Sequence, residues 1–377
     1  MMARLEEICA INMGQSPDSS TYNEDGNGLP FFQGNADFGE IYPAVRMWCS
    51  EPTKIAREKD ILISVRAPIG ALNIANCECC IGRGLAALTV NEDICAQEYL
   101  WHVLSSKVDE LNSKGTGSTF KAINKKTLSE IEIPLPPLDE QRKIAAVLDK
   151  VSDLIAKRRQ QLDKLDELVK SRFIELFGDP LVDDGRYPKR ALGALAEVGS
   201  SKRIFEKEYV AEGVPFYRTK EIVELSKGNR ITTELFITRE RYDEIRDEYG
   251  MPQKGDLLIS AVGTIGVIWI VDGQNDFYFK DGNLLRVAAT ERFAPTYLKH
   301  LLESLIGAYK QEMSSGTAYA ALTISALKEM QVYEVPLAEQ EQFAAFVAQT
   351  DKSKLAVQQG LQELEILKKS LMQEYFE

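Results

Sequence analysis

The sequence contains only two histidines, and none of its six cysteines lies beyond residue 95. A function shared by both halves of the chain therefore does not depend on a thiol. Cys77, Cys79 and Cys80 resemble half of a metal site, but zinc would need a further ligand from Cys49 or Cys95. Reduced, partly buried thiols are the simpler interpretation of this cluster.

Long apolar runs and an excess of positive charge are also missing. No run approaches the ~18 apolar residues of a membrane span. The first residues, MMARLEEICAINMG, are typical of neither a signal peptide nor a transit peptide, so we expect a cytoplasmic protein. The net charge of −12 argues against broad, non-specific nucleic-acid binding. Any contact with nucleic acid must rest on local basic clusters or on a partner.

Motifs for catalysis are absent as well. The sequence has no G-x-x-x-x-G-K-(S/T) phosphate loop. His102 and His300 occupy equivalent places in the two halves, and we interpret them as structural residues. Asp60/Asp256 and Ser64/Ser260 also recur, but without a third partner at a useful spacing. An enzyme with a duplicated catalytic domain is therefore not supported.

A 40-residue segment occurs twice. Residues 138–177 align without a gap to residues 337–376, at an offset of 199, with thirteen identical positions. Each copy lacks proline, is rich in strong helix formers and places apolar residues at a period of 3.5, which predicts a long helix with a coiled-coil seam. Pro137 and Pro336 precede the two helices, and Gly178 follows the first. Forty residues of helix span about 60 Å.

The segments that flank the helices repeat too. GLPFFQGNAD is matched by GVPFYRTKEI, and KDILISVRAPIGALNIA is matched by KGDLLISAVGTIGVIWI. We therefore divide the chain into 1–137, 138–178, 179–336 and 337–377, a globular domain and a long helix taken twice. Strands mixed with single helices predict two similar α/β (α+β) domains. Antiparallel helices would give the chain a pseudo-two-fold axis. A lone helical hairpin used for dimerisation would not require the flanking segments to match.

In this order, doubled, the motifs resemble the specificity subunit of type I restriction-modification systems. The resemblance rests on the paired motifs above, on a G-T loop with a following aromatic residue, and on P-L-x-E-Q at the start of each long helix. It covers essentially the whole chain. It implies that each globular segment is a target recognition domain that reads one half of a bipartite, asymmetric DNA site, and that the helices fix the spacer between the halves.

The resemblance also implies partners. The helices would dock two methyltransferase (modification) subunits that carry S-adenosylmethionine, and two restriction subunits that use ATP and Mg would join in a complete nuclease. The specificity subunit itself would bind no cofactor and catalyse nothing, which agrees with the absence of an N-P-P-Y or D-P-P-Y tetrapeptide. The predicted partner-binding residues at the helix starts are Gln141, Ile144, Leu148, Gln340, Phe343 and Val347.

Base readout requires Arg, Lys, Asn or Gln at base edges, with further basic groups on phosphates. In the second domain the candidates are Ser201, Lys202, Arg203, Tyr217, Arg218, Thr219, Lys220, Lys227 and Arg230. In the first domain they are Ser16, Tyr22, Gln33, Asn35, Arg66, Arg83, Lys121 and Lys125, together with a polar loop that includes Gly117 and Ser118. Arg218 is the single residue that we favour, because it follows a Gly-Val-Pro turn between an aromatic residue and a hydroxyl.

One hypothesis of a different class stays open, namely a coiled-coil scaffold that holds two protein-binding domains. It predicts that DNA has no effect on the complexes of the protein. The target sequence itself does not follow from the residues, since side-chain readout by such domains has no general code.

Overall fold

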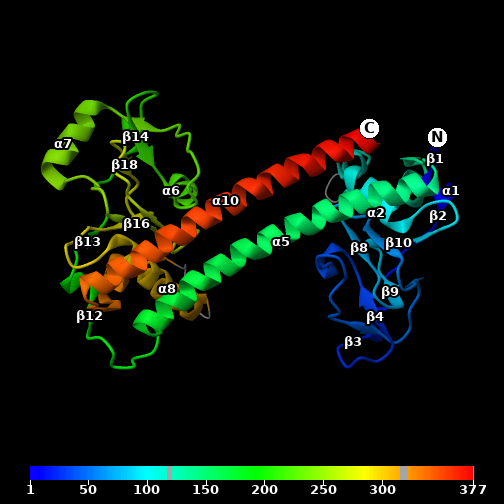
Figure 1. Cartoon of the computed structure of the whole chain (residues 1–377), viewed down its shortest axis with the longest axis horizontal. Helices are drawn as coiled ribbons and strands as arrows, with labels where there is room; N and C mark the ends of the chain where they lie inside the picture. Colours follow the sequence, from blue (N-terminus) through cyan, green and yellow to red (C-terminus); the bar gives the residue numbers. More distant parts are fainter. Residues whose placement is uncertain (117–120, 315–320, 377) are drawn as a thin grey trace. The chain divides into compact units, whose positions relative to one another are not determined.

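The computed structural model describes residues 1–116, 121–314 and 321–376, which form two compact units (Figure 1). Unit 1 consists of Met1–Gln160 and Gln358–Glu377, and unit 2 consists of Gln161–Val357. Each unit mixes helices with small sheets. Both long helices pass from one unit into the other, so each unit holds part of each helix.

Unit 1 is built around a four-stranded antiparallel sheet in the order β2-β10-β7-β8. A second sheet, in the order β3-β5-β4-β9-β6, and the pair β1-β11 complete its strands. The strands are β1 Met2–Arg4, β2 Cys9–Met13, β3 Tyr22–Asn23, β4 Leu29–Phe32, β5 Trp48–Cys49, β6 Ile55–Ala56, β7 Ile61–Ser64, β8 Leu72–Ile74, β9 Cys79–Ile81, β10 Leu85–Val90 and β11 Glu132–Pro134. The helices are α1 Leu5–Ile8, α2 Gln97–Ser106, α3 Val108–Ser113 and α4 Lys125–Ser129, with short 3-10 turns η1 Ser19–Thr21 and η2 Asn35–Asp37.

Unit 2 repeats this plan with a four-stranded antiparallel sheet in the order β13-β19-β16-β17. A three-stranded sheet, β15-β14-β18, and the pair β12-β20 complete it. The strands are β12 Lys189–Ala191, β13 Val198–Gly199, β14 Val214–Tyr217, β15 Phe236–Ile237, β16 Leu257–Ser260, β17 Ile268–Ile270, β18 Tyr278–Phe279, β19 Leu284–Val287 and β20 Gln331–Tyr333. The helices are α6 Thr219–Ser226, α7 Arg239–Tyr249, α8 Pro295–Ser314 and α9 Ile324–Glu329, with 3-10 turns η3 Leu192–Ala194 and η4 Glu206–Glu208.

The matched segments 59–75 and 254–270 form the hairpins β7-β8 and β16-β17. Gly70 and Gly266 turn each hairpin with φ of +90° and +88°, a conformation that favours glycine. A Cβ at Gly266 would lie 2.8 Å from the Ile306 side chain of α8, so the turn also needs glycine in order to pack. The two segments aligned by sequence, GLPFF and GVPFY, form β4 and β14, which pair in parallel with β9 and β18.

The two long helices are α5, Leu138–Phe177, and α10, Leu337–Phe376 (Figure 1). Their bounds coincide with those of the repeated segment. In unit 1 the first half of α5 packs with the last turns of α10, and Arg159 forms an ion pair with Glu365 at 2.8 Å. In unit 2 the last turns of α5 pack with the first half of α10, and Asp166 pairs with Lys354 at 2.6 Å. The helices therefore pair antiparallel within each unit.

Each helix ends on a phenylalanine that enters the core of the domain preceding the other helix. Phe376 meets Tyr99 edge-on in unit 1, with ring centroids 5.6 Å apart. Phe177 meets Tyr297 edge-on in unit 2, with centroids 4.9 Å apart. The two tyrosines and Phe177 are fully buried. Aromatic side chains of this size contribute much of the apolar area that a small core can bury.

Each helix also begins with a buried glutamine that binds three backbone groups. The Gln141 amide accepts from the Ala96 N–H at 2.9 Å and donates to the carbonyls of Ile94 and Pro136 at 3.1 and 2.8 Å. Gln340 repeats the pattern with the Ala294 N–H and the carbonyls of Arg292 and Val335. Both side chains are 0% exposed. The recurring E-Q motif is therefore the joint between each helix and its domain.

We expect Gln141→Ala and Gln340→Ala to lower the free energy of unfolding by roughly 2–4 kcal/mol each, because three buried backbone groups lose their partner. Denaturant unfolding followed by circular dichroism measures the change. Gln160→Ala, at an exposed position of the same helix, is the matched control and should stay within about 0.5 kcal/mol of the original chain. Equal stabilities for Gln141→Ala and the control would contradict this role.

Candidate nucleic-acid interface

In unit 1 the structure brings Gln33, Arg83 and Ser16 together. The turn Gly82–Gly84 lies against Gln33, since the Gly84 N–H donates to the Gln33 carbonyl at 3.1 Å. A Cβ at Gly84 would lie 2.4 Å from that carbonyl oxygen, so the close approach requires glycine. The Arg83 N–H donates to the Ser16 hydroxyl at 3.3 Å. The turn thus presents an exposed arginine beside an exposed glutamine amide.

Arg66 and Lys121 lie on the segments next to this turn. The Val65 N–H donates to the Gly84 carbonyl at 2.8 Å, and the Ala67 N–H donates to the Lys121 carbonyl at 3.1 Å. Three neighbouring segments therefore each carry one exposed basic residue, and we call Arg66, Arg83 and Lys121 the basic edge. None of the three forms an ion pair with any residue in the described ranges.

Tyr22 and Asn35 are half-buried. The Tyr22 ring lies 4.7 Å from the Phe31 ring, and its hydroxyl donates to the Pro17 carbonyl at 2.9 Å. Burial raises the pKa of Tyr22, so its hydroxyl stays protonated at neutral pH. Asn35 begins the turn η2 that follows β4. Both residues are therefore less accessible to a ligand than the exposed Gln33.

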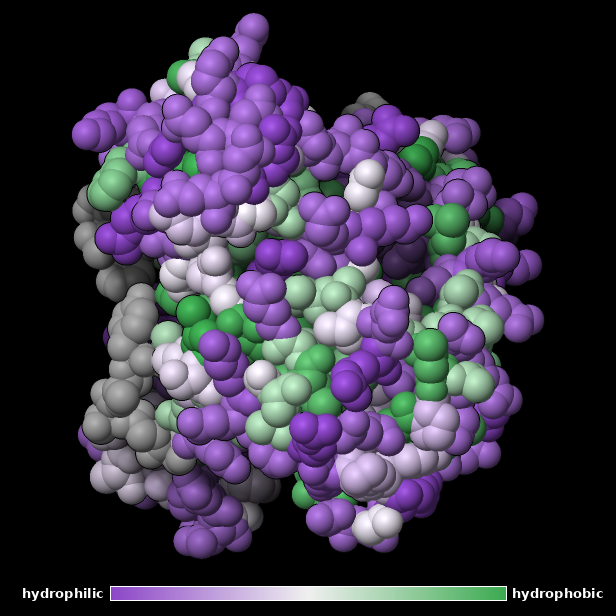
Figure 2. All heavy atoms as spheres, turned by 90° about the vertical axis from the view of Figure 1, so that its left-hand side faces the viewer, coloured by the Kyte–Doolittle hydropathy of each residue, from purple (hydrophilic) through white to green (hydrophobic). Residues whose placement is uncertain are grey.

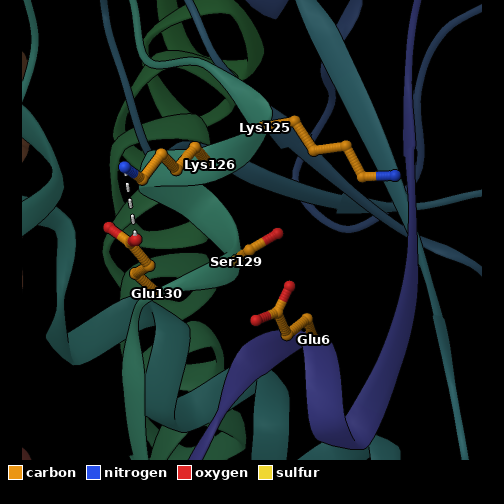
Figure 3. A pocket seen from close by; sticks show the side chains of 5 residues that line it. All are labelled: Glu6, Lys125, Lys126, Ser129 and Glu130. Carbon is orange, nitrogen blue, oxygen red and sulfur yellow. Dashed lines mark ion pairs between the residues drawn. The ribbon is translucent and has the colours of Figure 1, made fainter.

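Lys125 lies on α4, beside a shallow hollow of about 400 Å³ lined by Glu6, Lys125, Lys126, Ser129 and Glu130 (Figure 3). Lys126 turns toward Glu130, with 3.9 Å between the ammonium and a carboxylate oxygen, whereas Lys125 extends away from that pair. The hollow combines two cations with two anions and is therefore not a basic patch. The predicted loop residues Gly117 and Ser118 lie outside the described residues.

In unit 2 the loop after β13 presents Lys202 and Arg203. The Ser201 hydroxyl donates to the Phe279 carbonyl at 2.6 Å, and the Lys202 N–H donates to the Tyr278 hydroxyl at 2.6 Å. These bonds fix the loop. The Lys202 ammonium lies 4.7 Å from the centroid of the Tyr249 ring, and Arg203 pairs with Asp281 at 2.9 Å.

Phe205, whose ring is exposed, lies two residues after Arg203. The sequence-based candidates do not include Phe205, although it lies close to a short basic stretch. The surface of unit 2 around α7 is mainly hydrophilic, with hydrophobic residues gathered farther from that helix (Figure 2).

Tyr217, a predicted DNA contact, is buried in the structure. Its side chain is 7% exposed and stacks on Phe277 with centroids 4.6 Å apart, because β14 points it into the core. Arg218 bonds through its guanidinium to Glu221 at 3.0 Å, and that carboxylate is 2% exposed. The bond to Glu221 raises the pKa of Arg218, so the arginine we favoured remains charged and is held in this pair.

The remaining candidates of unit 2 differ in their surroundings. Thr219 follows Arg218, and its hydroxyl oxygen is buried without a hydrogen-bond partner among the residues described. Lys227 pairs with Glu224 at 3.1 Å. Lys220 and Arg230 are exposed, and neither forms an ion pair within the part of the chain that the structure covers.

The six predicted partner-binding side chains are buried in the described structure. Gln141, Leu148, Gln340 and Phe343 are 0% exposed, and Ile144 and Val347 are 9% and 6% exposed. They belong to the cores of their own units, because the inner face of each helix start covers its domain. The exposed apolar side chains of the helices are instead Val147, Leu154, Leu168, Ile174, Leu337, Leu355, Ile366 and Leu367.

The two histidines each lie close to a carboxylate, and Cys79 and Cys80 are buried. His102 is buried, with 2.7 Å between its Nε2 and an Asp149 carboxylate oxygen, and burial lowers its pKa. His300 lies 3.1 Å from Glu303. Cys79 and Cys80 are buried, and burial raises the pKa of Cys79 to about 12, so this thiol stays protonated. Within the described ranges, no group of three His, Cys, Asp or Glu side chains is placed to hold a metal ion.

None of the helices in the described ranges is both long enough and apolar enough to cross a membrane. Each unit contains a four-stranded antiparallel sheet of equivalent strand order and is completed by parts of two antiparallel helices, so the chain has a duplicated fold. Comparison with known families is more specific. Residues 1–167 and 186–366 match the type I restriction modification DNA specificity domain. The chain therefore belongs to the type I restriction-modification DNA specificity family.

The chain is also similar to individual proteins with names of this family. The chain is 45% identical, over 165 residues, to the protein assigned as the type I restriction enzyme MjaX specificity subunit of Methanocaldococcus jannaschii. That match covers 44% of this chain and only 39% of the relative. A crystal structure of the type I restriction-modification S subunit from M. genitalium has a TM-score of 0.58 at 16% identity, covering 100% of this chain and 96% of that one. A chain from a structure of type I R-M complex assembly and conformational transition has a TM-score of 0.60 at 18% identity, covering 99% and 96%. At these identities the two structures establish the fold alone.

We expect Arg218→Ala to destabilise unit 2 by about 1–3 kcal/mol, because it leaves the buried Glu221 carboxylate without its cation. Denaturant unfolding measures the effect. Arg230→Ala, at an exposed position, is the matched control, and Arg218→Ala/Glu221→Gln should recover part of the loss. If Arg218→Ala unfolds like the control and instead changes DNA recognition, the guanidinium reads bases and is not a structural cation.

Proposed function

We propose that this chain is the DNA-reading subunit of a type I restriction-modification complex, acting in the cytoplasm and catalysing no reaction itself. Unit 1 would read one half of a bipartite, asymmetric DNA site, and unit 2 would read the other half. Membership of the specificity family supports the class of function. The division of labour between the units rests on a property of this chain, namely that its two domains share a scaffold and differ at the exposed loops.

The strand registers identify which residues correspond. Ser64 pairs with Leu85 across β7-β10, and Ser260 pairs with Leu284 across β16-β19. Two residues before each leucine, unit 1 has Arg83 and unit 2 has Gly282. Two residues after each serine, unit 1 has Arg66 and unit 2 has Val262. The scaffold serines are identical while the loop residues differ, as two domains that read different half-sites require.

The long helices would fix the spacer between the half-sites and dock two methyltransferase subunits that carry S-adenosylmethionine. Two restriction subunits with ATP and Mg would complete a nuclease. The exposed apolar side chains of α5 support docking better than the buried helix starts do. Val147, Leu154 and Leu168 are 40–48% exposed and are spaced by multiples of seven residues, which places them on one helix face.

The net charge of −12 bears on how the chain would hold DNA. The phosphate backbone of DNA repels an acidic protein, and the binding of DNA to such a protein weakens further as the salt concentration rises. We therefore propose that the isolated chain binds DNA weakly and that the methyltransferase partners supply much of the phosphate contact.

The proposal predicts a specific methylation pattern in the host. Genomic DNA is sequenced with detection of methyladenine, from cells with the gene intact and from cells with the gene deleted. Deletion should remove methylation from one motif that has two short halves around a fixed gap. A deletion strain complemented with the original gene is the control and should regain the motif. Unchanged methylation in a strain that expresses the neighbouring methyltransferase would contradict the proposal and favour a protein scaffold.

A further inference from the structure

The three cations of the basic edge have no counterparts at the corresponding positions that the structure describes in unit 2, although Lys280 lies on the equivalent turn, since its N–H donates to the Tyr217 carbonyl as the Gly82 N–H donates to the Phe32 carbonyl. Arg66 forms an isolated bridge with Ala122, and its counterpart Val262 forms one with Ala321. Gly282 replaces Arg83, and the residue before Ala321 in the sequence is Ala320, where unit 1 has Lys121. At the two matching positions that the structure describes in both units, the edge thus carries Arg66 and Arg83 in unit 1 and Val262 and Gly282 in unit 2.

The arginine that unit 2 does place at this edge is already neutralised. Val198 pairs with Val287 as Ile11 pairs with Leu88. Arg203 and Ser16 each lie five residues after the first member of these pairs, so they occupy equivalent positions. The Arg203 guanidinium bonds to Asp281, which directly precedes Gly282. A phosphate that approaches Arg203 must compete with a carboxylate on the same protein. Such a contact releases less counterion from the DNA than a contact with an unpaired cation.

The surroundings of the basic edge suit a phosphate. The three cations come from segments joined by backbone hydrogen bonds, so their Cα positions are fixed relative to one another. Gly82 and Gly84 flank Arg83 and leave its backbone without neighbouring Cβ atoms. Gln33 is exposed beside the turn and offers an amide of the kind that pairs with adenine edges. A phosphate contact here would therefore position a base-reading group.

We propose that Arg66, Arg83 and Lys121 form a phosphate-backbone anchor, so that unit 1 contributes more salt-dependent DNA affinity through this edge than unit 2 does. Unit 2 contributes less here because Arg203, the arginine on its equivalent edge, is already paired with Asp281. This inference rests on the proposed function. It assigns unequal tasks to this edge in the two units, namely anchoring in unit 1 and no comparable anchoring in unit 2.

The test uses the complex of this chain with its methyltransferase subunits and a duplex that carries the methylated motif. Binding is measured by fluorescence anisotropy between about 50 and about 200 mM salt, and the slope of log K against log salt is compared. The triple variant Arg66→Gln, Arg83→Gln, Lys121→Gln should lower the magnitude of the slope by about 2–3, because each phosphate contact contributes roughly 0.9. Its affinity at the upper salt concentration should fall on the order of 100-fold, with the methylated motif unchanged.

The matched control removes the same charge from paired cations of unit 2. Arg190, Arg239 and Arg246 have side chains that are 52%, 54% and 49% exposed, and each pairs with a carboxylate. Their triple change to Gln should alter the slope by less than about 1. Arg83→Gln alone should lower the slope by about 1, which keeps the test valid if the triple variant folds poorly.

Equal slope changes in the two triple variants would overturn the anchor. A changed motif with an unchanged slope would overturn it as well, because it would make the basic edge a base reader. Both results leave the proposed function intact. If the unsubstituted complex shows no preference for any motif, the proposed function fails and the anchor fails with it.

Discussion

The fold depends on the exchange of helix ends between the two halves of the sequence. Phe376, the last residue of α10, packs on Tyr99 of unit 1, and Phe177, the last residue of α5, packs on Tyr297 of unit 2. Neither domain core is therefore complete without the helix that follows the other domain. This constraint makes the antiparallel pairing of the helices a consequence of core packing, and the surface ion pairs such as Arg159–Glu365 add little to it.

The buried glutamines give the same scaffold its second fixed point. Gln141 and Gln340 each satisfy one N–H and two carbonyls in the segments that join a domain to its helix. Replacing a buried amide that has three partners leaves backbone groups unpaired and destabilises the fold. The exposed loops have no such constraint. Arg83 is exposed and Gly282 has no side chain, so neither position contributes to the core and the two residues can differ, as a pair of independent recognition surfaces requires.

Much of the fold followed from local sequence patterns. The burial of individual side chains did not follow from these patterns. The helices Leu138–Phe177 and Leu337–Phe376 and the hairpins at Gly70 and Gly266 were predictable, because periodicity, proline and glycine act over short distances. The burial of Phe343 did not follow from the sequence, because an apolar helix face looks the same in sequence whether it covers its own domain or another protein. Arg218 was favoured as a base contact because the sequence does not show that it pairs with the buried carboxylate of Glu221. The convergence of Arg66, Arg83 and Lys121 depends on pairing between distant segments, which no local pattern encodes.

The central claim is that each unit carries its own half of the DNA specificity on a shared scaffold. The most direct measurement is the methylation motif produced by a chain in which residues 1–137 replace residues 179–336, so that both helices follow copies of the same domain. The account predicts a two-fold symmetric motif made of two inverted copies of one original half. A folded chain of this kind that still methylates the original asymmetric site would contradict it, because the second half would then be read by something other than unit 2.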